Sequence, residues 1–105
     1  MLKQRTLRNP IKAEGIGLHS GQNITMELIP AEINSGIRFI RTDIDESVLI
    51  PAIAENVGDT SLSTALIMDD IKISTIEHLM SAIAGLGVDN CIIKVDGPEV
   101  PIMDG

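Results

Sequence analysis

Residues 75–90 read TIEHLMSAIAGLGVDN and carry the clearest helical pattern of the chain. Four apolar residues recur at intervals of three and four, which places them on one stripe of a helix: Ile76, Leu79, Met80 and Ile83. Gly85 and Gly87 follow, and either can adopt the left-handed conformation that ends a helix. The pattern therefore predicts a helix over residues 75–84 that packs its apolar stripe against a sheet.

The remaining segments alternate short apolar runs with Gly, Pro, Asn and Asp, which is typical of strands separated by turns. Strands are expected at residues 5–8, 11–17, 23–29, 37–41, 51–57, 62–68, 71–74 and 90–95. The sixth and seventh of these are expected to form a hairpin across Asp69-Asp70. One helix among so many strands predicts an α+β fold in which the helix covers one face of a sheet.

Glu77 and His78 stand side by side at the start of the predicted helix, and two interpretations of the pair are open. Ser74 precedes Glu77 by three residues, the spacing of a capping box in which the glutamate bonds back to the serine amide. Spacing alone favours this structural role, whereas a cap at Thr75 would leave Glu77 available for chemistry. A lone histidine is more often a surface residue than a ligand. Catalytic zinc takes three protein ligands, and the residue pattern alone does not assemble them.

Two further segments are rich in chemically useful residues but lack a catalytic or phosphate-binding spacing. Residues 15–21 (GIGLHSG) do not match a phosphate-binding loop, so we expect a strand end and a tight turn that leaves His19 open to a substrate. Residues 59–64 (DTSLST) contain no Gly-x-Ser-x-Gly motif, which favours hydroxyls on a solvated strand face. Cys91 lies in an apolar strand, where we expect a buried, inert thiol.

The charge and composition of the chain exclude several classes of partner. Among 105 residues, 15 are acidic and 8 are basic, giving a formal net charge of −7, which argues against nucleic acid and anionic membranes as partners. No apolar run approaches the roughly 20 residues of a membrane-spanning helix, and no signal peptide is visible. The single cysteine excludes a disulfide framework and a multi-cysteine zinc site. A soluble, cytoplasmic protein is expected.

Six segments follow one another in an order that is specific to one enzyme family. They are KQRTL (3–7), GIGLHSG (15–21), RTD (41–43), DTSLST (59–64), ISTIEHL continuing through AGLGVDN (73–90), and EVPIMDG (99–105). Together they resemble the amino-terminal part of the UDP-3-O-acyl-N-acetylglucosamine deacetylases, the zinc enzymes of lipid A synthesis. The resemblance extends from Lys3 to Gly105.

The resemblance implies an enzyme built from two similar α+β domains that face each other across the active site. Residues 1–105 would form an incomplete first domain, a two-layer sandwich of a mainly antiparallel sheet with one helix, of the ribosomal protein S5 domain 2-like kind. A closing helix is expected after Gly105. The second domain would lie outside the chain.

The resemblance also implies roles for individual residues. His78 matches the zinc-ligating histidine, and Glu77 matches the general base that takes a proton from the attacking water. Further residues match loops beside the metal and the substrate, with serine at position 63 where the family often has cysteine: Leu18, His19, Leu62 and Ser63. The implied substrate is a UDP-linked acylated amino sugar, which loses its N-acetyl group in the committed step of lipid A (lipopolysaccharide) biosynthesis.

The resemblance places the other half of the chemistry outside these residues. The family's second histidine ligand, its aspartate ligand and its general-acid histidine lie in the second half of the enzyme. The chain alone is therefore expected to lack deacetylase activity. Two alternatives are a binding or interaction module that keeps the fold without the chemistry, and a structural domain in which Glu77 only caps the helix.

Overall fold

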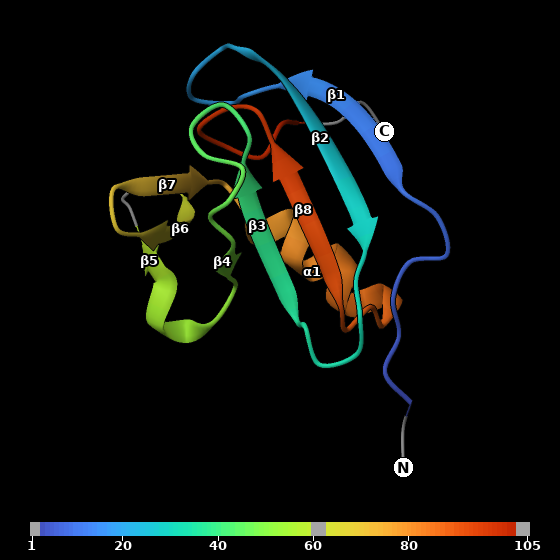
Figure 1. Ribbon diagram of the computed structural model, residues 1–105. Coiled ribbons are helices and arrows are strands. Elements are labelled where there is room, and N and C mark those ends of the chain that lie inside the picture. Colours follow the sequence, from blue (N-terminus) through green and yellow to red (C-terminus); the bar gives the residue numbers. More distant parts are fainter. Residues whose placement is uncertain (1–2, 60–62, 103–105) are drawn as a thin grey trace.

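The computed structural model describes residues 3–59 and 63–102, which form eight strands, one α-helix and one short 3-10 helix (Figure 1). In chain order these elements are β1 (Ile11–Ile16), β2 (Asn23–Pro30), β3 (Ile37–Arg41), β4 (Ile50–Pro51), the 3-10 helix η1 (Ala54–Asn56), β5 (Val57–Asp59), β6 (Thr64–Met68), β7 (Ile71–Ser74), α1 (Glu77–Leu86) and β8 (Cys91–Val95).

The main sheet has five strands in the order β1-β2-β8-β3-β4, and all neighbours are antiparallel except β3 and β8. Buried and more exposed residues alternate along β2 and β8, as expected for a sheet that packs one face on a core. Helix α1 covers that face and lies behind β2 and β8 in Figure 1. Its Ile83, and Ile76 just before its first residue, join the same apolar cluster as Phe39 and Ile93. The structure therefore confirms an α+β fold with a mostly antiparallel sheet.

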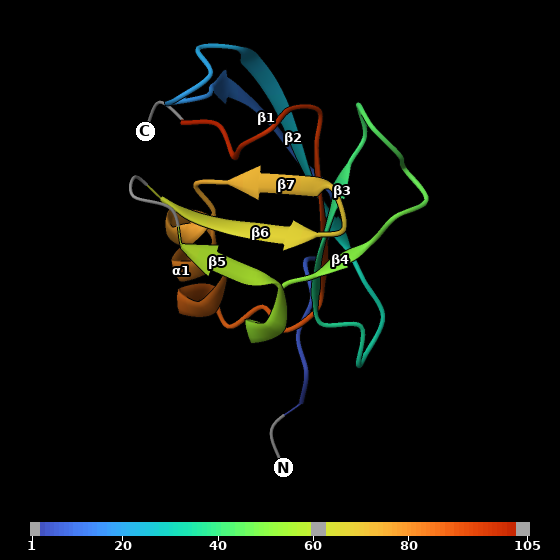
Figure 2. The same cartoon turned by 90° about the vertical axis from the view of Figure 1, so that its left-hand side faces the viewer.

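A second, three-stranded sheet of order β5-β6-β7 was not predicted. Figure 2 shows these strands on the same side of the main sheet as α1, and their buried residues Leu66 and Ile73 belong to the same core. Arg41, at the end of β3, donates from Nη1 to the backbone oxygen of Lys72 at 3.1 Å, and a salt bridge to Asp43 at 2.6 Å orients its guanidinium. This arginine therefore ties the two sheets together.

Two predicted strands are wrong in whole or in part. Residues 5–8 form no strand and make one isolated bridge, because the Arg5 oxygen accepts the N–H groups of Asp89 and Asn90 instead of a strand ladder. The strand expected at 51–57 is divided into β4, η1 and β5. Pro51 has no N–H with which to continue the ladder, and Asn56 donates its side-chain amide to the Pro51 oxygen at 2.8 Å.

Helix α1 lies two residues further along the chain than the spacing predicted. It begins at Glu77 because Thr75 has a φ of 61°, which is incompatible with a right-handed helix. It ends at Leu86, and Gly87, with a φ of 72°, forms the left-handed cap, while Gly85 stays inside the helix. The predicted stripe is confirmed, since Ile76 and Ile83 are buried and the other two residues pack against the core.

Candidate active site at the start of helix α1

In the turn that leads into α1, neither Ser74 nor Thr75 caps the helix as predicted. The Ser74 N–H, which a capping box would offer to Glu77, donates to the backbone oxygen of Pro98 at 2.9 Å. The N-cap residue is Ile76, and no side chain caps it. The Thr75 hydroxyl donates to Glu99 Oε2 at 3.3 Å. The capping-box prediction and its alternative at Thr75 are both wrong.

Glu77 instead bonds to the first residue of β6. Its Oε2 accepts the N–H of Thr64 at 3.1 Å, and the N–H of Ile76 donates to the Thr64 oxygen at 3.2 Å. These two bonds place Ser63, the residue before Thr64, beside the start of α1. Leu62, also expected near the substrate, lies outside the described residues. Since a carboxylate has about four acceptor sites, Glu77 keeps the capacity to accept a proton while bonded to Thr64.

His78 is exposed and lines a cavity of about 370 Å³. The other lining residues come from β2, from α1 with the turn before it, and from the segment after β8: Met26, Thr75, Leu79, Ala82, Val100, Pro101 and Ile102. The cavity is thus mainly apolar, with one imidazole and one hydroxyl among its side chains. Such a lining suits a ligand whose apolar part fills the cavity while a polar group lies beside the imidazole.

Glu99 connects this region to the loop between β1 and β2. It is 1% exposed, and its Oε1 accepts the backbone N–H groups of His19 at 3.0 Å and Ser20 at 2.8 Å. Burial alone would raise the pKa of Glu99, but the hydrogen bonds from Ser20, His19 and Thr75 outweigh it and hold that pKa below its ordinary value. The glutamate is therefore a charged, hydrogen-bonded bridge inside the fold.

The Leu18–His19 pair lies on an exposed turn, as predicted. Gly17 has to be glycine there, because a Cβ would overlap Glu99 Oε1 and Ser20 Oγ. Leu18 lines a second cavity of about 490 Å³, and Ile102 lines both this cavity and the one beside His78. Leu18 and His78 thus line two cavities that share Ile102 as a wall, whereas His19 and Glu77 line neither cavity.

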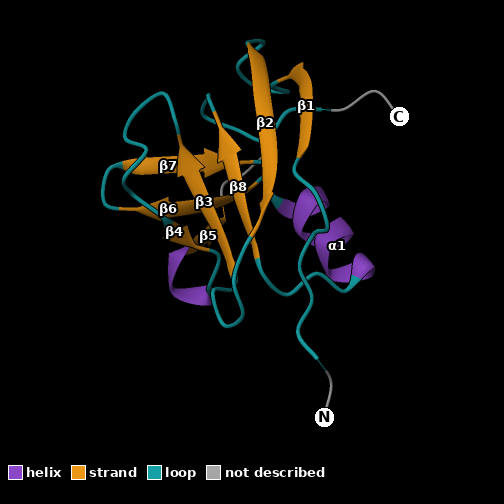
Figure 3. Cartoon of the chain, turned by 45° about the vertical axis from the view of Figure 1, so that its right-hand side comes forward, coloured by secondary structure: helices purple, strands orange, loops and turns teal. Residues whose placement is uncertain are grey.

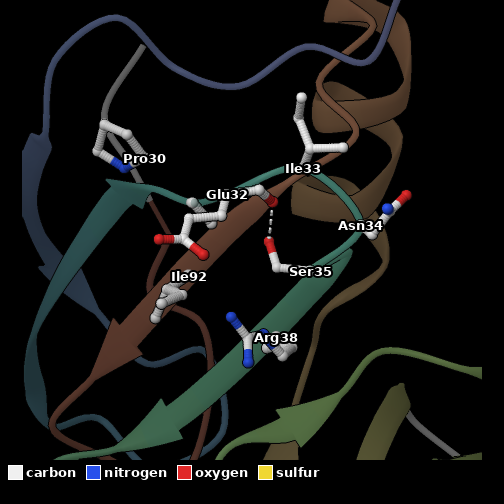
Figure 4. Close-up of a pocket in the computed structure, with 8 residues that line it drawn as sticks. Pro30, Glu32, Ile33, Asn34, Ser35, Arg38 and Ile92 are labelled. Atoms are coloured by element: carbon white, nitrogen blue, oxygen red, sulfur yellow. Dashed lines mark hydrogen bonds between the residues drawn. The ribbon is translucent and has the colours of Figure 1, made fainter.

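A further cavity, of about 720 Å³, lies elsewhere (Figure 4). Arg38 and Ile92, two of its lining residues, are register partners on β3 and β8. Their neighbours Phe39 and Ile93 are buried in the core, and successive side chains of a strand point to opposite faces. The cavity therefore lies on the face of the sheet opposite the core, whereas α1 lies on the core side of the sheet (Figure 3). No predicted site residue lines it, and we assign it no part in the site.

Comparison with known proteins shows which family the chain belongs to. The sequence model of the family described as UDP-3-O-acyl N-acetylglycosamine deacetylase matches residues 4–105. The chain belongs to this deacetylase family. It is 60% identical over 105 residues to the UDP-3-O-acyl-N-acetylglucosamine deacetylase of Teredinibacter turnerae, and 59% identical to that of Saccharophagus degradans. Each alignment covers the whole chain and 35% of the relative, so the chain spans about a third of the length of these curated relatives.

The described residues do not form a complete metal site. Within residues 3–59 and 63–102, no group of three or more His, Cys, Asp or Glu side chains could hold a metal ion. His78 fits one position of a zinc site, because its imidazole is exposed beside a cavity, but catalytic zinc takes three protein ligands. No helix among the described residues is long and apolar enough to span a membrane.

Three residues that bond within this candidate site were not predicted from the sequence. Thr64 bonds to Glu77, while Thr75 and Glu99 bond to each other. All three lie in segments that carry the family resemblance, but nothing in those segments indicated these hydrogen bonds. Cys91 is buried in β8 as predicted, and burial raises the pKa of its thiol.

Proposed function

We propose that the chain supplies one side of the active site of a zinc-dependent deacetylase that removes the N-acetyl group from a UDP-linked acylated amino sugar. Membership of the family supports the reaction, because the relatives are UDP-3-O-acyl-N-acetylglucosamine deacetylases. The observation that carries the proposal in the structure is the pair Glu77 and His78 at the first turn of α1, beside an apolar cavity.

The proposed roles follow from the chemistry of the two side chains. His78 is one zinc ligand, and bound zinc supplies a Lewis acid that also lowers the pKa of water to about 7. Glu77 accepts a proton from the water that attacks the acetamide carbonyl. The Thr64 N–H holds Glu77 Oε2 at 3.1 Å, which fixes the carboxylate in one orientation. A base fixed in this way needs little reorganisation when the proton moves.

The neighbouring loops are proposed to bind the substrate. Leu18 and His19 stand on the exposed turn after β1, and Ser63 lies next to the residue that Glu77 holds. Leu62 is proposed for the same role from the family resemblance. The cavity beside His78, with mostly apolar walls, suits part of the acyl chain.

We further propose that residues 1–105 form an incomplete amino-terminal domain, the first of two domains of the ribosomal protein S5 domain 2-like kind. The second half of the same enzyme would then supply the other zinc ligands and the general acid. On this proposal the enzyme acts in the cytoplasm on lipid A precursors. The 105-residue chain alone, supplied with zinc, should release no acetate, and turnover by the purified chain would contradict this proposal.

A chimaera tests the catalytic roles. The chain replaces the matching 105 residues of the Teredinibacter turnerae deacetylase, and acetate release from UDP-3-O-acyl-N-acetylglucosamine is measured. Glu77→Gln should lower kcat by about 10²- to 10⁴-fold with zinc content unchanged, whereas His78→Ala should lower the zinc content. Glu46→Gln, at an exposed glutamate, is the control. Full activity of the Glu77→Gln chimaera would refute the general-base role, and substrate binding without turnover in the unmodified chimaera would favour a binding module.

A further inference from the structure

We propose that Glu99 is a positioning residue that fixes the substrate loop, defined as residues 17–21, against the turn that begins α1. The proposal rests on the proposed function, because it adds Glu99 to the same site. Glu99 makes no contact with the reacting atoms in this proposal. It acts through the residues to which it bonds.

The two carboxylate oxygens of Glu99 bond to two different parts of the site. Oε1 accepts the backbone N–H groups of His19 and Ser20, at 3.0 and 2.8 Å, in the substrate loop. Oε2 accepts the hydroxyl of Thr75 at 3.3 Å, two residues before Glu77. One side chain therefore spans the loop that carries His19 and the turn that starts α1.

Thr75 is the residue in this turn that most needs a partner. Its φ of 61° lies in the left-handed region, which is rare for a β-branched residue. This conformation turns the chain from β7 into α1, and so sets the direction in which Glu77 and His78 leave the sheet. The hydrogen bond to Glu99 stabilises the conformation, because it ties the side chain of Thr75 to a fixed acceptor inside the fold.

Backbone hydrogen bonds hold Glu99 in place from both sides. The Ser74 N–H donates to the oxygen of Pro98 at 2.9 Å, and the N–H of Val100 donates to the oxygen of Ser74 at 3.0 Å. Residues before and after Glu99 thus bond to the same residue of β7. A carboxylate on a segment held in this way meets the requirement for positioning, namely a rigid support for the group that orients others.

The substrate loop is shaped around the carboxylate. Any side chain at Gly17 would overlap Glu99 Oε1. The N–H of Ile102 donates to the oxygen of Ile16 at 2.9 Å, which anchors the strand that leads into the loop. The close approach of the loop backbone to the Glu99 carboxylate therefore requires glycine at position 17.

A buried glutamate can also be purely structural, and the two roles predict different kinetics. If Glu99 only stabilises the fold, its loss reduces the number of folded molecules, so Vmax falls while KM is unchanged. If Glu99 positions the substrate loop, every folded molecule binds substrate less well, so KM rises. The test therefore depends on KM and not on total activity.

The experiment compares Glu99→Ala, Glu99→Gln and Asp89→Ala in the chimaera. Asp89 is the matched control, because its carboxylate accepts the backbone N–H of Arg5 at 2.8 Å but lies beyond the other end of α1. E99A should raise KM about tenfold with zinc content unchanged. E99Q keeps an oxygen that can accept both loop N–H groups and should restore KM to within about threefold of the unmodified value. D89A should leave KM unchanged.

Amide hydrogen exchange provides a readout that does not depend on turnover. E99A should increase the exchange rates of the His19 and Ser20 amides about tenfold or more, while the Gly87 amide, bonded to the Ala84 oxygen, is unaffected. If E99A does not fold, Glu99→Asp replaces it, because the shorter side chain cannot reach both parts of the site.

The outcomes separate the two proposals. Unchanged KM with a lower Vmax, or unchanged exchange at the two loop amides, would overturn the role of Glu99. An unmodified chimaera that releases no acetate would overturn the proposed function instead. In that case the exchange measurement still decides whether Glu99 holds the loop.

Discussion

Gly85 and Gly87 lie two residues apart at the end of α1, and alanine at the two positions should change stability in opposite directions. Gly85 is inside the helix, and a Cβ there would meet no described atom within 4 Å. Gly87 is the left-handed cap with a φ of 72°, and its N–H bonds to the Ala84 oxygen. A Cβ at Gly87 would meet only Arg5 Nη1 among the described atoms, at 3.9 Å, so its effect comes from backbone conformation alone.

The magnitudes follow from these conformations. Alanine inside a helix is more favourable than glycine by about 0.5–1 kcal/mol, so Gly85→Ala should stabilise the chain by that amount. Alanine in the left-handed region costs about 1–2 kcal/mol, so Gly87→Ala should destabilise it by about 1 kcal/mol or more. The two variants should then differ by about 2 kcal/mol, or roughly 10 °C in Tm for a chain of this size.

Urea denaturation of the chain, followed by circular dichroism, measures the difference. Both variants add one methyl group to the same helix end, so errors from extrapolation and from the unfolded state largely cancel. The midpoints should lie on opposite sides of that of the unmodified chain, separated by about 1 M urea. Stabilisation by Gly87→Ala, or the same sign for both variants, would refute the assignment of Gly87 as the cap.

Three other changes test the core and the Glu99 bridge. Ile83→Ala, at a residue 4% exposed, should lower the unfolding free energy by about 2–5 kcal/mol in urea; a loss below about 1 kcal/mol would contradict packing of α1 on the sheet. Thr75→Val keeps the β-branched shape but removes the donor to Glu99, and should cost about 1–3 kcal/mol in the same assay; no loss would show that the bond is not stabilising. Burial raises the pKa of Glu99, but hydrogen bonds from Ser20, His19 and Thr75 hold it below its ordinary value. A carboxyl with a lowered pKa stabilises the fold above its unfolded pKa of about 4.3 and loses that contribution as pH falls through the folded pKa. The unfolding free energy should therefore fall as pH is lowered below about 5, and it should fall less steeply in Glu99→Gln. Equal pH dependence in the two proteins would contradict a lowered pKa of Glu99.

Local patterns predicted the elements whose hydrogen bonds and packing are also local. The stripe in α1 is confirmed because helix periodicity depends only on neighbouring residues. The hairpin of β6 and β7 is confirmed across Asp69-Asp70, where Asp69 has a φ of 55°. Alternation along residues 23–29 likewise predicted β2, since one face of that strand packs on the core.

Patterns failed where a partner distant in sequence takes a backbone group. The Ser74–Glu77 spacing indicates a capping box, but Pro98 takes the Ser74 N–H. Residues 5–8 have the composition of a strand, yet their backbone pairs with the loop after α1. The hydrogen bonds of Glu99 were not predicted, because its partners lie 24 and about 80 residues away. No local rule reports which distant group a polar atom will meet.

The bonds that orient the proposed site are internal to this chain, whereas a full set of zinc ligands is not found among its described residues. Thr64 orients Glu77, and Glu99 connects the substrate loop to the turn before α1. Orientation and metal binding are therefore separable properties. The loop amides should be protected from exchange in this chain even where zinc binds weakly, because their acceptor is a buried carboxylate and not the metal. Weak zinc binding by the chain would consequently leave the positioning role intact, whereas rapid exchange of those amides would remove it.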